Sequence, residues 1–152
     1  MKPYLEVTNS ETAGDQAPCD SPPLPSVSQI ESLLRFIPAF GNATSAHAEW
    51  QIKPGVVPWC SLSDAALELY RALYEEGFVI LFPWPDWQRE GMRYVDAPDL
   101  VASADLRTLC QLITMHVRAD RFCEGHFASQ LASGQIAAIL HRLAIIRDEL
   151  SH

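Results

Sequence analysis

Lysine is scarce in this 152-residue chain, where it occurs only as Lys2 and Lys53. The other basic residues are scattered arginines, and acidic residues outnumber basic ones, so the formal net charge is −8. Surfaces that bind nucleic acid are usually basic, because much of their affinity comes from neutralising phosphates. We therefore expect neither a nucleic acid nor an anionic membrane as a partner.

Paired cysteines and long apolar runs are also missing. The four cysteines, Cys19, Cys60, Cys110 and Cys123, include no C-x-x-C pair. No stretch approaches the roughly 18 apolar residues of a membrane span, and no apolar run follows Lys2 as it would in a secretory signal. These features predict a cytoplasmic protein with reduced thiols and no membrane segment.

Residues 1–25 differ in composition from the rest of the chain. They are rich in Ser, Thr, Pro, Asp and Glu and show no hydrophobic periodicity. Such a segment buries too little apolar surface to offset the entropy lost on ordering. We predict a disordered tail over residues 1–25 and a single globular domain over residues 26–152, because the hydrophobic fraction of 48% is sufficient for a packed core.

Apolar residues at helical spacing predict most of the secondary structure. A first helix is expected to begin near Ser28, whose spacing to Glu31 fits a capping box, and to end at Pro38. The best-formed helix is expected from Ser63 to Gly77, with Gly77 in the left-handed conformation that often ends a helix. Its apolar face should comprise Ala66, Leu67, Tyr70, Leu73 and Tyr74.

Four more helices are predicted in the second half of the chain. One starts at Pro83 and runs to about Tyr94, and the next is capped by Ser103. Glycines 125 and 134 then separate a short helix from its neighbours. The inward residues of the last three helices should be Leu106, Leu109, Cys110, Ile113, Val117, Phe127, Leu131, Ile136, Ile139, Leu140, Leu143 and Ile146.

Short strands are expected at three places. Residues 50–53 alternate apolar and polar side chains, residues 56–59 follow a Pro54-Gly55 turn, and residues 78–82 form a β-branched and aromatic run. The predicted fold is therefore mainly α within the α+β class. It is a compact bundle of about five or six helices with a small two- or three-stranded sheet.

The densest polar cluster is His116-Val117-Arg118-Ala119-Asp120-Arg121-Phe122-Cys123-Glu124-Gly125-His126, where one predicted helix ends and another begins. Its candidate ligand-binding or structural residues are Arg118, Asp120, Arg121, Glu124 and His126. In a structural interpretation, the arginines pair with the carboxylates and hold the helix corner together. In a ligand-binding interpretation, the arginines and a helix N-terminus after Gly125 bind a phosphate or carboxylate.

Metal binding and catalysis at this cluster are weaker interpretations. Two imidazoles, His116 and His126, with a carboxylate would suit zinc or iron, but their spacing matches no established ligand pattern, and we predict no metal. A Cys123–His126 dyad is compatible with the spacing, but it has no evident acidic residue to orient the imidazole.

Other features of the sequence do not identify a reaction. The chain has no G-x-x-x-x-G-K-[ST], G-x-G-x-x-G or G-x-S-x-G motif, so we predict no cofactor and cannot assign catalytic residues. Four tryptophans could line a pocket or stack on bases, or they could fill the gap between strands and helices. These are Trp50, Trp59, Trp84 and Trp87.

Several motifs resemble an uncharacterised bacterial family of domains of unknown function. They are Leu34-x-Phe36-Ile37-Pro38-x-Phe40, Ala72-Leu73-Tyr74-x-x-Gly77-Phe78, Trp84-Pro85-x-Trp87 and, most specifically, Arg118-x-Asp120-Arg121-Phe122-Cys123-Glu124-Gly125-His126. The resemblance covers about residues 30–147. It implies a bacterial intracellular protein and supplies no activity, because none is assigned to the family.

The sequence favours a non-catalytic interaction or regulatory domain, with an unknown protein as its partner. The alternative is a small-molecule or anion-binding domain, which could be enzymatic, centred on the segment from Arg118 to His126. The two interpretations differ in where those side chains point. A closed network of ion pairs would favour a structural role for the cluster, and an open pocket with unpaired arginines would favour a ligand.

Overall fold

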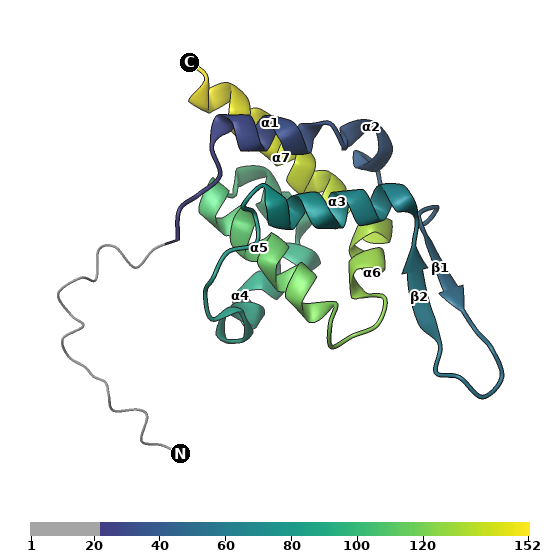
Figure 1. Cartoon of the computed structure of the whole chain (residues 1–152). Helices are drawn as coiled ribbons and strands as arrows, with labels where there is room; N and C mark the ends of the chain where they lie inside the picture. The colour runs from purple at the N-terminus through teal and green to yellow at the C-terminus, as the bar shows by residue number, and fades with distance from the viewer. Residues whose placement is uncertain (1–21) are drawn as a thin grey trace.

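The computed structural model describes residues 22–152 (Figure 1), so residues 1–21 of the predicted tail lie outside the described part of the chain. Pro22–Ser26 precede the first helix without regular secondary structure. The elements that follow are α1 (Val27–Leu34), α2 (Ile37–Phe40), β1 (Ala48–Gln51), β2 (Trp59–Leu62), α3 (Asp64–Glu75), α4 (Trp84–Asp96), the 3₁₀ helix η4 (Pro98–Ser103), α5 (Leu106–Ala119), α6 (His126–Ser133) and α7 (Gln135–Leu150).

This architecture confirms a mainly α fold with a small sheet. The described residues contain more helices than the five or six expected, because a single turn, α2, follows Phe36 and because the 3₁₀ helix η4 precedes α5. None of the helices in residues 22–152 combines the length and the apolar character needed to cross a membrane.

Helix α7 is the element around which the bundle is arranged. It lies against α1, α2, α6 and η4, while α4 packs on α5 (Figure 1). All the inward residues predicted for α6 and α7 are buried, as are those of α5 except the half-buried Leu106. On α3 the prediction was partly wrong, because Leu67 is 43% exposed and Leu69 is buried in its place.

Two predicted helix caps lie a few residues away from the caps in the structure. The capping box of α1 is formed by Ser26 and Gln29, because each side chain accepts a hydrogen bond from the other residue's backbone N–H group, at 3.2 and 2.8 Å. Helix α5 is capped by Asp105, whose carboxylate accepts from the N–H group of Thr108 at 2.8 Å. The predicted cap, Ser103, is instead the last residue of η4.

The end of α3 has the predicted left-handed glycine. Gly77 has φ +82°, and the N–H group of Phe78 donates to the carbonyl of Leu73 at 3.0 Å. This bond and the Gly77 bond to Tyr74 at 3.2 Å satisfy two carbonyls that the helix leaves without partners.

The strand predicted over residues 78–82 is wrong. No neighbouring strand is available in the described residues, and this segment packs on α5 instead. The N–H group of Ile80 donates to Thr114 Oγ1 at 2.8 Å, and that hydroxyl donates to Cys110 O at 2.7 Å. An apolar run cannot by itself distinguish a strand from a buried irregular segment.

Strands β1 and β2 form an antiparallel hairpin that projects from the helical body (Figure 1). Its register pairs Ala48 with Leu62, Glu49 with Ser61, Trp50 with Cys60 and Gln51 with Trp59. Both strands lie two or three residues away from their predicted positions, because the connection between them is a seven-residue loop over 52–58. The predicted Pro54-Gly55 turn lies within this loop, where the N–H group of Val56 donates to the carbonyl of Lys53 at 3.2 Å and Gly55 has φ +77°.

Candidate functional site

The predicted polar cluster forms the connection between α5 and α6, here called the α5–α6 corner (residues 120–125). Its last residue, Gly125, has φ +83°, a conformation that residues with a Cβ rarely adopt. A Cβ at this position would also lie only 2.6 Å from Cζ2 of Trp50. Glycine is therefore required twice, for the backbone turn and for the close approach of the Trp50 ring from β1.

The two carboxylates of the corner bind backbone N–H groups. Asp120 Oδ1 accepts from the N–H group of Phe127 at 2.9 Å, which satisfies a donor in the first turn of α6. Glu124 Oε2 accepts from the N–H group of Cys60 at 2.7 Å, which ties β2 to the corner. Asp120 and Glu124 therefore stabilise the junction through the main chain.

The predicted ion-pair network at the corner was wrong. The ion pairs of the described residues are Arg93–Glu90, Arg147–Glu31 and Arg147–Asp148, and none of them involves Arg118 or Arg121. The physical reason is that the carboxylates of the corner are oriented toward main-chain donors on α6 and β2. Both arginines therefore have no carboxylate partner in residues 22–152.

Tyr70 of α3 contacts both helices that meet at the corner. Its hydroxyl donates to the carbonyl of Val117 at 3.1 Å, and its ring packs edge-on against Phe127 at 5.1 Å between centroids. Burial, followed by the negative charge of Asp120, raises the pKa of Tyr70 to about 12. The phenol therefore stays protonated and remains a donor at neutral pH.

A chain of hydrogen bonds passes through the bundle beside the corner. His116 Nδ1 lies 3.0 Å from His126 Nε2, and His116 Nε2 lies 3.2 Å from Gln135 Oε1. Gln135 Nε2 donates to the carbonyl of Tyr94 at 3.3 Å, so its Oε1 must accept. It follows that His116 carries its proton on Nε2 and accepts at Nδ1, and that His126 donates from Nε2.

These hydrogen bonds require a neutral His116, because its Nδ1 atom accepts while its Nε2 atom donates. Burial lowers the pKa of His116 to about 4, although the hydrogen bond to Gln135 opposes the shift. Burial also lowers the pKa of His126, and here Asp120 opposes the shift. Within residues 22–152, no group of three or more His, Cys, Asp or Glu side chains is arranged to hold a metal ion. The Nε2 atom of His126 is hydrogen-bonded to His116, so this atom is not free to activate Cys123 as a Cys123–His126 dyad would require.

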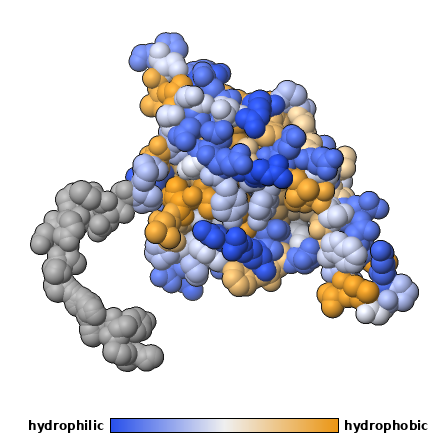
Figure 2. Space-filling view, in the orientation of Figure 1, coloured by the Kyte–Doolittle hydropathy of each residue, from blue (hydrophilic) through white to orange (hydrophobic). Residues whose placement is uncertain are grey.

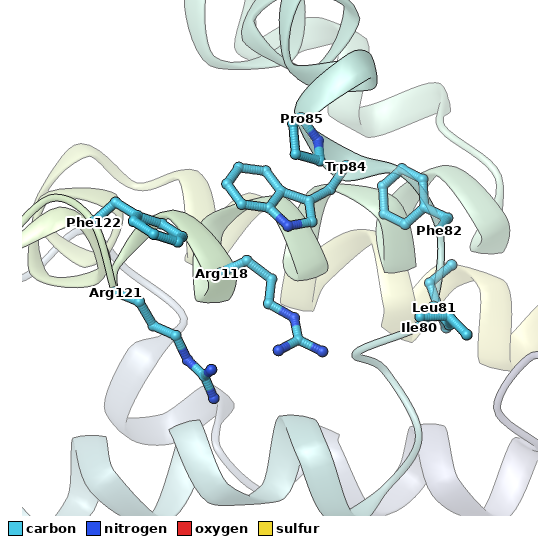
Figure 3. Close-up of a pocket in the computed structure, with 8 residues that line it drawn as sticks. All are labelled: Ile80, Leu81, Phe82, Trp84, Pro85, Arg118, Arg121 and Phe122. Carbon is cyan, nitrogen blue, oxygen red and sulfur yellow. The ribbon is translucent and has the colours of Figure 1, made fainter. Parts of the chain in front are cut away.

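The arginines that the corner leaves without carboxylate partners line a pocket of about 470 Å³. We call it the arginine–aromatic pocket, and its lining residues are Ile80, Leu81, Phe82, Trp84, Pro85, Arg118, Arg121 and Phe122. Figure 3 shows both guanidinium groups extending in the same direction, with the rings of Phe122, Trp84 and Phe82 along one side. The pocket therefore combines fixed positive charge with an apolar wall.

Local backbone geometry brings the two arginines together. Arg118 lies in the last turn of α5, and the N–H group of Arg121 donates to the carbonyl of Arg118 at 3.1 Å, so the two residues share one turn. Cations at a helix C-terminus are favoured by the helix dipole. This effect accounts for arginine near the end of α5, but it does not require two arginines to point into one pocket.

The apolar wall contains unusually exposed side chains. Leu81 is 85% exposed and Phe122 is 82% exposed, although both are large and hydrophobic. The Phe122 ring lies 6.2 Å from that of Trp84, which packs against the core with part of its surface. Exposed apolar groups beside a pocket are typical of binding sites.

Sequence reasoning identified Arg118 and Arg121 but missed most of the wall. Ile80, Leu81 and Phe82 lie between α3 and α4, and Trp84 and Pro85 begin α4, more than thirty positions before the arginines in the chain. The aromatic run Phe82-Pro83-Trp84 was a usable signal, yet it was interpreted as a strand end and a helix start. The four tryptophans have two different environments. Trp84 and Trp87 pack against the core, and Trp50 and Trp59 lie exposed on the hairpin.

Comparison with protein families matches residues 25–149 to the model of a family whose description is "Family of unknown function (DUF6508)". No curated protein and no solved structure matches the chain. The match spans α1 to α7 and includes the hairpin, the corner and the arginine–aromatic pocket.

Proposed function

The chain belongs to the DUF6508 family of unknown function, and we propose that it is a non-catalytic binding domain. Its arginine–aromatic pocket takes a small molecule that carries a carboxylate or phosphate next to an apolar or aromatic group. The observation that carries this proposal is that Arg118 and Arg121 line one pocket without a carboxylate partner among the described residues.

Guanidinium groups suit this ligand class. Arginine forms two parallel hydrogen bonds to one carboxylate or phosphate, and it stays charged at every physiological pH. The rings of Trp84, Phe82 and Phe122 offer flat apolar surface to the remainder of the ligand. The volume of about 470 Å³ lies within the range of known small-molecule sites, roughly 300–1,000 Å³.

The composition of the lining supports binding without chemistry. Its side chains are aliphatic, aromatic or guanidinium groups, and none of these is a general base at neutral pH. The carboxylates of the adjoining corner, Asp120 and Glu124, accept main-chain hydrogen bonds, and His126 is hydrogen-bonded to His116.

We also propose that the domain works in a bacterial cytoplasm and does not bind nucleic acid. The resemblance of its motifs to a bacterial family supports the bacterial assignment, and cysteines without a C-x-x-C pair fit a reducing compartment. A formal charge of −8 opposes nucleic acid, because two arginines neutralise too few phosphates for strong binding.

The test uses phenyl phosphate and benzoate as probes. Inorganic phosphate and phenol serve as controls, because each carries only one of the two groups that phenyl phosphate combines. Each is titrated into the ¹⁵N-labelled full chain, and indole and arginine side-chain signals are followed by NMR. We expect both aromatic anions to bind with shifts at Trp84 and at the two arginines, and we expect either half alone to bind at least ten-fold more weakly. The aromatic anion that binds more tightly indicates whether the natural ligand is a phosphate or a carboxylate.

Three variants make this test specific. Arg118→Gln and Arg121→Gln should each weaken phenyl phosphate about ten-fold or more, because a charge-assisted hydrogen bond contributes about 1.5–3 kcal/mol. Arg71→Gln removes an exposed arginine from α3 and should change nothing. If neither anion binds at about 10 mM, or if the three variants bind equally well, the proposal is wrong.

A further inference from the structure

The outer edge of β1 has unpaired main-chain groups. The N–H group of Cys60 donates to Glu124, so it points away from β1. In two antiparallel strands, facing residues that do not hydrogen-bond to each other both direct their N–H and C=O groups away from the partner strand. Trp50, the partner of Cys60, therefore directs its own groups away from β2. The α5–α6 corner covers the edge of β2, and β1 is the outermost element on that side (Figure 1).

This open edge adjoins exposed apolar side chains. Trp50 is 50% exposed, Ile52 is 75% exposed and Val57 is 82% exposed. Figure 2 shows apolar surface at the end of the projecting hairpin, away from the main body. Isolated two-stranded sheets are marginally stable in water, and an exposed apolar edge readily accepts another strand.

We propose that β1 pairs with β1 of a second copy of this chain, which makes an antiparallel four-stranded sheet around a two-fold axis at Trp50. In this register Trp50 faces Trp50 of the other copy, Ala48 faces Ile52, and Glu49 faces Gln51. The outward groups of Ala48, Trp50 and Ile52 then form the hydrogen bonds.

The sequence of β1 suits this symmetric register. Ala48, Trp50 and Ile52 alternate with Glu49 and Gln51, so an apolar stripe continues across both copies on one face of the sheet. The central Trp–Trp pair is of the aromatic cross-strand kind that stabilises sheets. On the other face, each carboxylate of Glu49 lies opposite the neutral amide of Gln51. No like charges therefore meet directly, although each copy carries a net charge of −8.

The register offers a matched pair of variants at Gln51. Gln51→Lys would place a positive charge opposite Glu49 twice in each dimer, and Gln51→Glu would place a negative charge there twice. Both variants replace the amide whose Nε2 atom donates to Ser61 Oγ at 3.0 Å, so it is the opposite direction of their effects on the dimer that reports the charge facing Glu49. Two cross-strand charge pairs should change the dimer dissociation constant about five-fold in each direction.

Sedimentation velocity of the full chain, over about 5–500 μM at physiological ionic strength, measures this constant. We expect a concentration-dependent dimer, tightened by Gln51→Lys and weakened by Gln51→Glu. Hydrogen exchange of the Trp50 amide should slow as the dimer forms. Three results would overturn the inference: a Gln51→Lys chain that stays monomeric at about 500 μM, a dimer on which both variants act in the same direction or not at all, or a Trp50 amide that is protected only when a different protein is added.

Discussion

Acidification should destabilise this protein through His116. This imidazole has 0% exposure and hydrogen bonds that only its neutral form satisfies. Burial lowers its pKa from 6.5 to about 4 in the folded chain, and the unfolded chain keeps a value near 6.5. The unfolded state therefore binds one more proton than the folded state between these two values. At 1.36 kcal/mol per pH unit, this difference removes about 3 kcal/mol of stability as the pH falls from 6.5 to 4.

The direction of the effect follows from the sign of the shift. A histidine with a lowered folded-state pKa contributes its full stability above pH 6.5, and that contribution is lost progressively toward pH 4. The groups that face His116 are His126 and Gln135, and Asp120 acts on His126. Since the pKa of His126 is lowered as well, it adds to the loss in the same pH range.

Urea unfolding of the wild type and of His116→Gln at pH 7, 6, 5 and 4.5, followed by circular dichroism, measures the contribution of His116. The variant should be less stable at pH 7, because it loses the hydrogen bond to His126 or to Gln135. Its free energy of unfolding should fall less steeply with decreasing pH, and the slope should differ from that of the wild type by nearly the contribution of one bound proton. The free energies of the variant and the wild type should therefore converge on acidification. Parallel curves would show that His116 titrates equally in both states, and the reasoning from burial would be refuted.

Two further substitutions test the local packing. Gly125→Ala should cost about 2 kcal/mol or more, because it adds strain at φ +83° to a clash with Trp50, whereas the control Gly55→Ala at φ +77° has open space and should cost only about 1 kcal/mol in the same urea assay. Equal costs would show that Trp50 does not rest on Gly125. Thr114→Val should cost about 1–3 kcal/mol, because it leaves the buried N–H group of Ile80 without its acceptor. An unchanged midpoint would mean that residues 78–82 are held by their apolar side chains alone.

The helices were predictable because their signals are local. Apolar spacing identified the buried faces of α6 and α7, and the glycine at position 77 marked the end of α3. The caps at Ser26 and Asp105 were missed because several Ser and Asp residues nearby fit the same short pattern, and tertiary packing selects among them. The run over 78–82 was misread because its partner is the hydroxyl of Thr114, 34 residues away from Ile80, and not another strand.

The candidate site was predictable as a segment but not as an arrangement. The sequence placed four charges between Arg118 and Glu124, and pairing opposite charges with one another was the simplest expectation. The acceptors Asp120 and Glu124 instead bind N–H groups of Phe127 and Cys60, and the contact to Cys60 joins residues 64 positions apart. No local pattern encodes such a choice, because it depends on where β2 meets the corner.

We propose that roles are divided at the α5–α6 corner, so that the carboxylates hold the structure and the arginines bind a ligand. Urea unfolding of two double variants tests it directly. Asp120→Asn with Glu124→Gln should lose about 2 kcal/mol, because charge-assisted bonds to main-chain donors on α6 and β2 are weakened. Arg118→Gln with Arg121→Gln should stay within about 0.5 kcal/mol of the wild type, as is usual for surface changes. A large loss of stability in the arginine variant, with the acidic variant unchanged, would show that the arginines and not the carboxylates hold the corner together.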